Sequence, residues 1–596
     1  MSKRSRKDIT FCDISSSDDD FYVESSDSDE VMENSSSDSG SEIQRVVRKQ
    51  FRRFNISSNS EDKGERQRNQ RDEANVDFTW RNVVNQDIED VKIPFTTGTK
   101  PVGPQAGYQC NEPIKFFKLF FTDQLMNTRL KETNKYARVK IARKNTSVHS
   151  TWNTWVDVTK AEISAFLGVI LNMGTMPLPN LKEYWSTARN AKIPYFAEIF
   201  RRDRFLQIFW MLHTNKKAAS AQNMRTRSEK ISKYLHYLDT KFRENFVSGR
   251  ELSIDEAVVK FKGKISFITY NPKKPTKWGI RIYTDANTGY VQAILPYYGS
   301  LTTENLVRPD LPVSSKIVLD LYQKVLDLRP EVAGHIIFTD RYFTSIPLPN
   351  ALLQKKKCYL TGTIQTNRKY IPDVIKKPIF SDNKIAAYRS DEILLLSWKD
   401  KRIVTLLSTW DTSATNKINR RMRGGGFLQL EKPVAIINYN NYMGGVDKAD
   451  QYTSTYCFMR KSNKWWRKLF FWGLEMCVVN AYIMYKFVLK KNNQKPISHV
   501  KFVRRLVDQL VGDFRDGSQR NTETSTSSEL ERLNDRLHII RHDDNGNCRD
   551  CIVCSNRKIK GGRKQTRSYC DTCPKKTFMC IGNCFQKYHT LENFKI

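Results

Sequence analysis

The clearest pattern along the chain is a change of hydrophobic period near residue 251. Across residues 111–250, apolar side chains recur every three or four positions and predict mainly helices with a solvated basic face. Beyond this point, apolar and polar residues alternate and predict strands over residues 251–261, 278–285 and 290–298. We therefore expect a helical region followed by a sheet.

The next segment continues this sheet as an α/β unit. Residues 315–328 have one apolar face at helical spacing, which predicts an amphipathic helix. Residues 335–340 (HIIFTD) predict a short buried strand that ends in an acid, and a further helix is expected from about Ser345. The predicted order of elements from residue 251 is thus β-β-β-α-β-α.

Residues 357–440 are again rich in strands. They are too long for a loop and have their own alternation, which favours an inserted β-rich subdomain. Inside it, residues 420–426 (RRMRGGG) predict a flexible turn or one that approaches phosphate. After the break at Gly444 and Gly445, a long helix is expected from near Asp447 to about Lys491.

These patterns divide the chain into seven expected parts. They are a tail at 1–75 (acidic, then basic), a helical region at 76–250, the first part of an α/β core at 251–356, the β-rich insertion at 357–437, the last core helix with a further helical region at 438–516, a Ser/Thr/Glu linker at 517–534, and a Cys-rich domain at 535–596.

Charge narrows the choice of partner. The 596 residues include 99 Lys and Arg but only 64 Asp and Glu, which gives a formal net charge of +35. A chain this basic usually binds a polyanion, and nucleic acid is the expected one. The acidic serines of residues 15–42 suit an acidophilic kinase or form a plain solvated tail, and basic residues 45–53 suit nuclear import or a DNA-backbone arm.

Membrane insertion and secretion are not expected. The most apolar stretch, residues 465–489, is interrupted by charged residues, and the N-terminus has no apolar signal-peptide core. The 12 cysteines are therefore not expected to form a disulfide framework.

Four acids have an unusual context. Asp255 lies within a predicted strand on the side of apolar residues, Asp340 ends a buried strand, and Asp447 and Asp450 share one face of a predicted helix. Taken singly, such residues are usually turn or cap residues. Together they favour an RNase H-like nuclease core, in which carboxylates hold two Mg²⁺ or Mn²⁺ ions for phosphodiester chemistry.

The segments around these acids also resemble a known family. LSIDEAVVKFKGK, HIIFTDRYFTSIPL and INYNNYMGGVDKADQY are similar to the three acidic motifs of piggyBac-type DDE transposases, and NPKKPTKWGIRIY and RKSNKWWRK resemble that family as well. The resemblance implies a catalytic triad of Asp255, Asp340 and Asp447, with Asp450 as a further acid. It also implies that Trp465 lies against DNA, while Arg341 stands where many relatives carry Asn.

The resemblance implies cut-and-paste transposition in the nucleus. The enzyme would bind the terminal inverted repeats, cleave through hairpin intermediates and join the ends to TTAA target DNA. It would act as a homodimer, with the helical regions serving dimerisation and DNA binding. The alternative is a domesticated, catalytically silent DNA-binding protein with the same fold.

The Cys-rich terminus predicts a zinc module. Paired CxxC motifs in a chain without a secretory signal indicate two Zn²⁺ ions, interleaved in a cross-brace. The eighth ligand could be His538, His542 or Cys548, and the resemblance favours His538. A protein-binding finger of a chromatin or ubiquitin factor is a further alternative. The other seven expected ligands are Cys551, Cys554, Cys570, Cys573, Cys580, Cys584 and His589.

Candidate DNA contacts follow from basic and aromatic residues near these motifs. They are Lys273, Lys274, Lys277, Arg341, Arg460, Lys461, Trp465, Arg557, Lys558, Lys560, Arg563 and Lys564.

Overall fold

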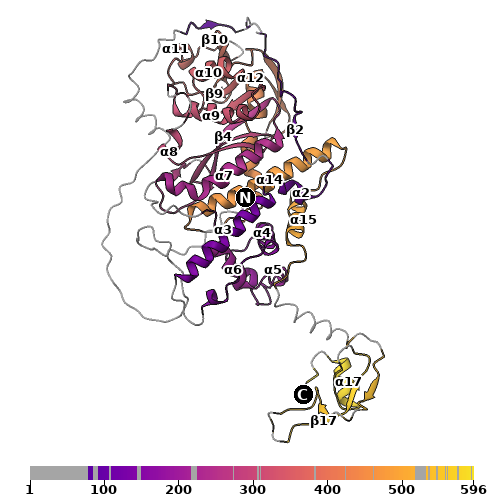
Figure 1. Cartoon of the computed structure of the whole chain (residues 1–596). Helices are drawn as coiled ribbons and strands as arrows, with labels where there is room; N and C mark the ends of the chain where they lie inside the picture. The colour runs from indigo at the N-terminus through magenta and orange to yellow at the C-terminus, as the bar shows by residue number, and fades with distance from the viewer. Residues whose placement is uncertain are drawn as a thin grey trace, which may run out of the picture. The chain divides into compact units, whose positions relative to one another are not determined.

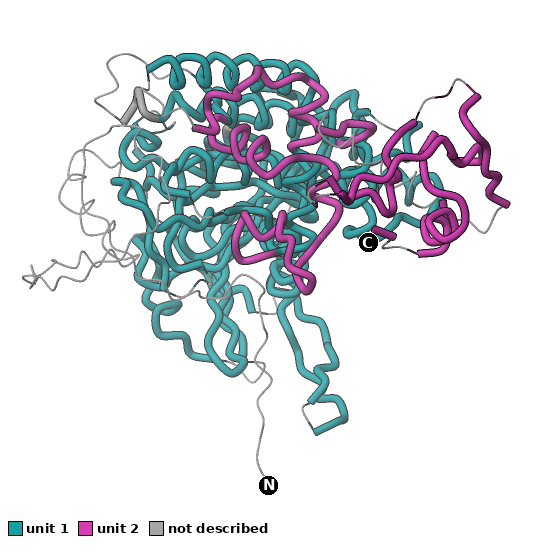
Figure 2. The backbone as a smooth tube through the Cα atoms, turned by 90° about the horizontal axis from the view of Figure 1, so that it is seen from below, with its two compact units in different colours: residues 1–143, 167–177, 212–510 teal, residues 144–166, 178–211, 511–596 magenta. Residues whose placement is uncertain are grey.

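The structure is a computed structural model, and its described part divides into two compact units (Figures 1 and 2). Unit 1 comprises residues 1–143, 167–177 and 212–510, and unit 2 comprises residues 144–166, 178–211 and 511–596. The predicted kinase and nuclear-import segments in residues 1–75 lie outside the described residues. The structure describes residues 78–84, 87, 91–106, 109–143, 150–215, 224–272, 274, 276–304, 306, 308, 310–380, 384–422, 424–460, 462–516, 532–533, 537–544, 546, 548–557, 559, 561–573, 576–591 and 594–595.

A ten-stranded mixed sheet forms the centre of unit 1. Its strands, in the order of pairing, are β1 (Arg81–Asn82), β10 (Ile385–Ser390), β11 (Ile393–Lys399), β12 (Ile403–Ser408), β9 (Tyr359–Thr363), β8 (Ile336–Thr339), β4 (Glu251–Lys260), β6 (Trp278–Asn287) and β5 (Thr269–Tyr270), with β7 (Tyr290–Pro296) also paired to β6.

The predicted order of elements from residue 251 is present. Strands β4, β6 and β7 form an antiparallel meander, helix α9 (Val313–Leu328) follows, and β8 returns parallel to β4. Helix α10 (Pro347–Lys356) then leads to β9, which is parallel to β8. Both crossovers contain a helix, as parallel neighbours require.

The prediction of an inserted β-rich subdomain at residues 357–437 is wrong in part. Strands β9 to β12 extend the central sheet, because β9 pairs with both β8 and β12. Alternate residues of β11 enter two different apolar clusters: Leu395 packs in one, Leu394 and Leu396 in the other. A strand buried on both faces belongs inside a large sheet. Only β13 (Thr415–Arg421) and β14 (Phe427–Pro433) form a separate two-stranded ribbon.

The expected single helix from Asp447 to Lys491 is also wrong. The chain forms α13 (Gly445–Thr455), leaves the helical conformation, and starts again as α14 (Trp465–Lys491). The intervening segment folds back along α14, where the Phe458 N–H donates to Glu475 Oε1 at 3.3 Å and the Phe458 ring packs against Phe471. These tertiary contacts replace two turns of helix.

The expected helical region before residue 251 is confirmed, with short strands at its ends. The elements of this region are β2 (Gly103–Pro104), α2 (Pro113–Lys118), α3 (Asp123–Ala142), η1 (Thr151–Thr154), α4 (Lys160–Thr175), η2 (Leu181–Trp185), α5 (Pro194–Ile199), α6 (Arg202–Met211), α7 (Met224–Asn245) and β3 (Phe246–Val247).

No helix in the described ranges is long and apolar enough to cross a membrane.

Other elements complete the two units. They are α8 (Ser300–Thr303), α11 (Asp373–Lys376), α12 (Val434–Tyr442) and α15 (His499–Val511), and in the C-terminal module β15 (Ile540–His542), β16 (Arg549–Asp550), β17 (Gln565–Thr566), β18 (Ser568–Cys570) and α17 (Asn583–Thr590).

The outer edge of the sheet is closed by the segment before α2. Strand β1 pairs with β10 there. Arg389 then donates from Nε and Nη2 to the Asp87 carboxylate at 2.6 and 2.8 Å, and the Ser413 N–H donates to the same carboxylate at 2.8 Å. Arg389 and Asp87 are both buried. Loss of either side chain would therefore leave the charge of the other one buried without a counter-ion.

A buried acid outside the site makes the fold sensitive to pH. Asp285 on β6 is fully buried, and its carboxylate oxygens have no hydrogen-bond partner within the described chain. Burial, together with the charge of Asp239, raises the pKa of Asp285 to about 8. The folded state therefore holds a proton that the unfolded state releases above about pH 4.

Asp285→Asn is accordingly expected to flatten the dependence of stability on pH. As pH rises from about 4 to about 8, this group should lower the free energy of unfolding of the wild-type chain by about 1.4 kcal/mol per pH unit. Above pH 8 it should cause no further loss. Thermal unfolding of both proteins at pH 5, 6.5 and 8 measures the difference. If the melting temperatures of the two proteins changed equally with pH, Asp285 would not be protonated in the folded state.

Candidate active site and zinc centres

The register of two parallel strands brings the first two predicted acids together. Ile254 on β4 lies opposite Thr339 on β8, so Asp255 in the middle of β4 and Asp340 just after the end of β8 follow side by side. Asp340 Oδ1 accepts a hydrogen bond from the Tyr342 N–H at 2.8 Å. This bond holds the Asp340 carboxylate at the start of the turn after β8.

Helix α13 supplies the other two acids. Its first residue, Gly445, lies so close to the sheet that an added Cβ would be 2.3 Å from Ser253 Oγ. Only glycine permits this approach, which presses the first turn of α13 onto β4 and β6. Asp447 lies in that turn, where the helix dipole favours a carboxylate, and Asp450 follows one turn later.

The electrostatics of the site show that its acids repel one another. Burial is the main cause that raises the pKa of Asp255, and the charges of Glu256 and Asp340 raise it further. Burial and Glu256 likewise raise the pKa of Asp340. Burial raises the pKa of Asp450 to about 7, with a contribution from Asp447. A half-buried group of repelling oxygen donors suits divalent cations such as Mg²⁺ or Mn²⁺.

Sequence reasoning missed two residues of this site and one role of a third. Tyr439 on α12 lies near these acids: burial raises its pKa to about 12, the charges of Asp340, Asp255 and Asp447 add to this, and its hydroxyl shares a hydrogen bond with Thr363 Oγ1 at 3.3 Å. Glu256 adds a fifth carboxylate, and Lys274 ion-pairs with it at 3.5 Å. Lys274, which is expected to contact DNA, also lies beside the acid cluster as a cation. The adjacent letters DE at 255–256 were the available signal for Glu256.

The remaining predicted DNA contacts are spread over several elements. Lys273, Lys461, Lys558 and Lys560 lie outside the described residues. Lys277 and Arg341 are exposed, and Arg460 is half-buried. Trp465 starts α14 and packs edge-on against Phe267 and Tyr298, at 5.3 and 6.1 Å between ring centroids. The structure thus gives Trp465 a packing role in addition to any contact with DNA.

The C-terminal module brings eight predicted zinc ligands into two groups of four. Within each group the ligand atoms lie within 4.8 Å of one another, as one tetrahedral ion requires. The groups alternate along the chain, so the module is a cross-brace. One group is Cys551, Cys554, Cys580 and Cys584, and the other is His538, Cys570, Cys573 and His589.

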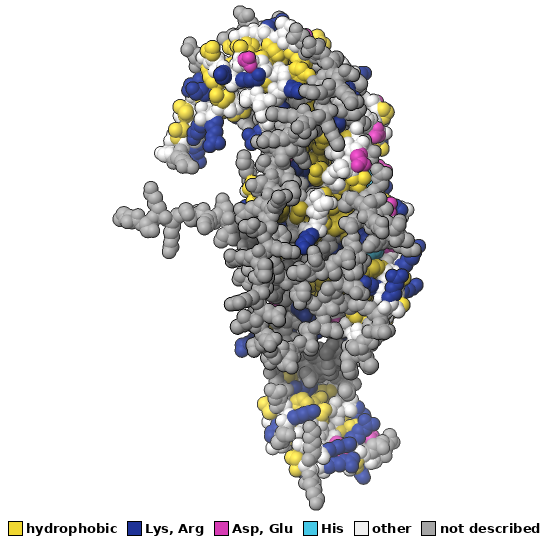
Figure 3. Space-filling view, turned by 90° about the vertical axis from the view of Figure 1, so that its left-hand side faces the viewer, with side chains coloured by type: hydrophobic (Ala, Val, Ile, Leu, Met, Phe, Trp, Pro, Cys, Tyr) yellow, Lys and Arg dark blue, Asp and Glu magenta, His cyan; other side chains and the backbone are white. Residues whose placement is uncertain are grey.

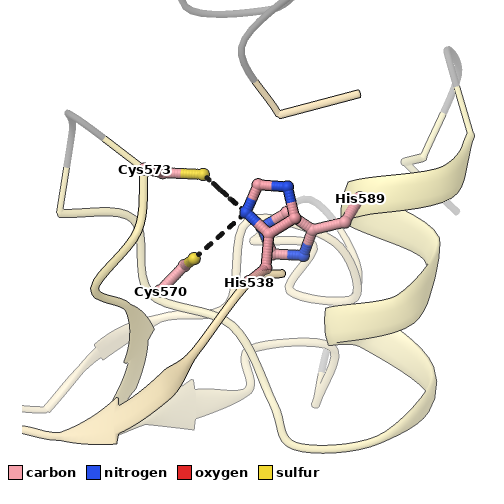
Figure 4. Close-up of side chains that lie close together, drawn as sticks. All are labelled: His538, Cys570, Cys573 and His589. Carbon is pink, nitrogen blue, oxygen red and sulfur yellow. Dashed lines mark hydrogen bonds between the residues drawn. The ribbon is translucent and has the colours of Figure 1, made fainter. Parts of the chain in front are cut away.

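The two alternative ligands lie elsewhere. His542 Nδ1 forms a hydrogen bond with Ser568 Oγ at 3.1 Å, and Cys548 Sγ accepts one from Arg567 Nε at 3.3 Å. In contrast, His538 Nδ1 lies 3.7 and 3.6 Å from the sulfurs of Cys570 and Cys573 (Figure 4). The geometry favours His538 as the eighth ligand.

Within the first group the local environment favours the thiolate of Cys551, whereas burial and the neighbouring sulfurs raise the pKa of Cys580 to about 11 and that of Cys584 to about 12. Burial opposes ionisation of the Cys551 thiol, but backbone N–H groups, among them that of Cys580, outweigh it and lower the Cys551 pKa to about 7. Thiolates are the form of cysteine that binds zinc. Four cysteines, or two cysteines and two histidines, are typical structural zinc sets.

The basic surface of the module is less available than its sequence implies. Arg557 and Arg563 both ion-pair with Asp550, at 2.6 and 2.9 Å. Both side chains nonetheless remain largely exposed, and Lys and Arg side chains gather on one side of this module in Figure 3. The insert between the ligand pairs therefore still presents positive charge.

Carboxylates from two adjacent strands and a following helix, on a mixed α/β fold, define a candidate nuclease site whose oxygen donors suit divalent metal ions. The chain belongs to the piggyBac family of DDE transposases: a family model described as transposase IS4 matches residues 112–482. The resemblance seen in the acidic motifs is thereby confirmed.

Curated relatives and a solved structure agree with this family. The chain is 24% identical to human PiggyBac transposable element-derived protein 2, over 75% of this chain and 72% of the relative. It is 26% identical to human PiggyBac transposable element-derived protein 3, over 66% and 64%. The fold matches a piggyBac transposase synaptic complex with hairpin DNA at a TM-score of 0.62, with 24% identity, covering 81% of this chain and 99% of that one.

Proposed function

We propose that the protein is a cut-and-paste DNA transposase with an RNase H-like catalytic core. The observation that carries the proposal is the convergence of Asp255, Asp340, Asp447 and Asp450 beside the C-terminal end of β8 in the central sheet. Membership in a transposase family and the basic charge of the chain support the same function. The DNA would be cleaved through hairpins and joined at TTAA.

The four aspartates would hold two Mg²⁺ or Mn²⁺ ions. Bound ions of this kind activate a water or a 3′-hydroxyl and stabilise the leaving oxygen of a phosphodiester. The protein supplies the carboxylates on rigid elements: the middle of β4, the end of β8 and a helix held to the sheet by the close approach at Gly445. Lys274 offsets part of the negative charge of this cluster before DNA enters.

Recognition of the DNA ends is assigned to the zinc module and the basic helical regions, acting in a nuclear homodimer. The serines of the acidic segment near the N-terminus remain candidate kinase sites.

Removing residues 535–596 is expected to weaken specific binding to the transposon ends about a hundredfold, with little effect on binding to unrelated DNA. Competition electrophoresis with end and scrambled duplexes measures this, and unchanged specificity would assign recognition elsewhere.

A direct experiment tests the function. The full-length protein is incubated with the DNA that flanks its gene, with Mg²⁺ or with EDTA. Nicks and hairpins at TTAA-bordered repeats, seen only with Mg²⁺, would establish a working transposase. Tight binding with no cleavage under either condition would favour the domesticated DNA-binding protein, an alternative suggested by relatives named as transposable element-derived.

A further inference from the structure

The ribbon β13–β14 is a well-formed structure that joins no other strand within the described chain. Seven residue pairs connect its strands, from Thr415 opposite Pro433 to Arg421 opposite Phe427. Its turn is closed by hydrogen bonds between Met422 and the glycines that follow. Gly425 and Gly426 have φ of +89° and +78°, which favours glycine. The ribbon projects from the body of unit 1 (Figure 2).

The ribbon is fixed to the sheet at two places, through Arg420 beside its turn and through Lys432 near its base. Arg420 donates from Nη1 and Nη2 to the two oxygens of Asp400, both at 2.8 Å, which is a bidentate ion pair on the loop after β11. Lys432 Nζ lies 6.0 Å from the centre of the buried Trp398 ring. The ribbon therefore has a set direction relative to the sheet.

The tip combines apolar and basic side chains in solvent. Phe427 is 73% exposed, and Met422 and Leu428 are each 48% exposed. Arg421, directly opposite Phe427, forms no ion pair with any described residue and is exposed as well. Figure 3 shows hydrophobic and basic side chains together on a projecting arm at the upper left. An exposed phenylalanine beside positive charge suits a partner that offers both anionic groups and flat apolar faces.

The ribbon is directly continuous with the catalytic elements. Strand β14 ends at Pro433, and helix α12 begins at the next residue and carries Tyr439 into the acid cluster. Seven residues of strand extend about 23 Å. The tip can therefore reach DNA only a few base pairs beyond a phosphodiester held at the carboxylates.

We propose that this ribbon docks on the duplex held for cleavage, enters its minor groove and wedges Phe427 between two base pairs. The proposal rests on the proposed function, since it requires DNA at the acid cluster. Arg421 would contact the flanking phosphates, and the glycine turn would let the backbone approach them. Two-stranded ribbons fit DNA grooves, and apolar side chains that enter between base pairs unstack and kink the duplex.

The test uses the full-length protein and a duplex containing the transposon end. Wild-type protein is expected to make thymines at one step near the cleavage site reactive to permanganate and to bend the duplex, as measured by energy transfer between end labels. Phe427→Ala should abolish the reactivity and the bend and slow cleavage about tenfold. Ile379→Ala is the matched control, because Ile379 is an apolar residue 91% exposed in the same unit.

A second variant separates docking from unstacking. Arg421→Ala should weaken DNA binding. It should also lower the slope of log affinity against log salt concentration by about one, because one phosphate contact is lost. At saturating protein it should leave the permanganate pattern intact. Lys377→Ala, at an exposed basic residue of the same unit outside the helical regions, is its control. These variants alter exposed side chains, so unchanged melting temperatures are expected and would separate the effects from misfolding.

The outcomes separate this proposal from the proposed function. Unchanged permanganate reactivity and bending in Phe427→Ala would overturn the wedge, and so would an equal loss in Ile379→Ala. A wild-type protein that unstacks and bends the duplex but never cleaves it would refute the transposase activity and leave the ribbon's role standing.

Discussion

Replacing Asp255 with asparagine is expected to lower the rate of DNA strand cleavage about a thousandfold or more while DNA binding persists. The amide keeps the shape of the side chain but removes one anionic donor from the site, and electrostatic stabilisation at such a site is worth several kcal/mol. Single-turnover cleavage of the end duplex in Mg²⁺ measures the loss. Electrophoretic mobility shift measures the retained binding.

The same substitution should not weaken the fold. Burial and the neighbouring charges of Glu256 and Asp340 raise the pKa of Asp255, so a neutral side chain relieves both the cost of burying a charge and the repulsion. The melting temperature in the absence of metal is expected to stay the same or rise. Asp508→Asn, an exposed carboxylate on α15, is the matched control and should cleave at the wild-type rate. Loss of binding and of thermal stability in Asp255→Asn would instead indicate a structural role.

Replacing Cys554 with serine is expected to release both zinc ions, not one. The ligands of the two groups alternate along the chain. Cys570 and Cys573 of one group lie between the two cysteine pairs of the other, so neither group can form without ordering the chain of both. The module has a small apolar core, to which ligand cysteines themselves contribute, so metal binding would supply most of its folding free energy. Zinc content per chain, measured with a colorimetric chelator, should fall from two to near zero.

Cys548→Ser is the control for this experiment. The Cys548 sulfur is exposed and lies beside Arg567, away from both groups, so its variant should keep two zinc ions. One zinc ion retained in Cys554→Ser would show that the two groups fold independently. Loss of zinc in Cys548→Ser would place that residue among the ligands.

The acids and cysteines could be predicted from the sequence because their signals are local. Asp340 ends an apolar strand, and paired CxxC motifs at short spacing have few other uses in such a chain. Strands β4, β6 and β7 could be predicted as well, because each has its own alternation of apolar and polar residues and a short turn joins β6 to β7. Each of these features is set within a few residues.

The errors concern contacts between distant residues. Strands β9 to β12 gave the same alternation whether they formed a separate subdomain or extended the first sheet, and only the pairing of β8 with β9 decides between the two. Tyr439 has no local sign of its place among the acids, because α12 brings it there from beyond the ribbon. The break before α14 likewise depends on the contact of Phe458 with Glu475.

The closed edge of the sheet has a practical consequence for where the chain can be shortened. A version that starts at helix α2 would look reasonable from the helical pattern alone. It would strip β1 from β10 and leave Arg389 buried without its carboxylate. The bared strand would then be open to pairing with other molecules and prone to aggregate. A shortened protein for crystallisation should therefore begin before Phe78.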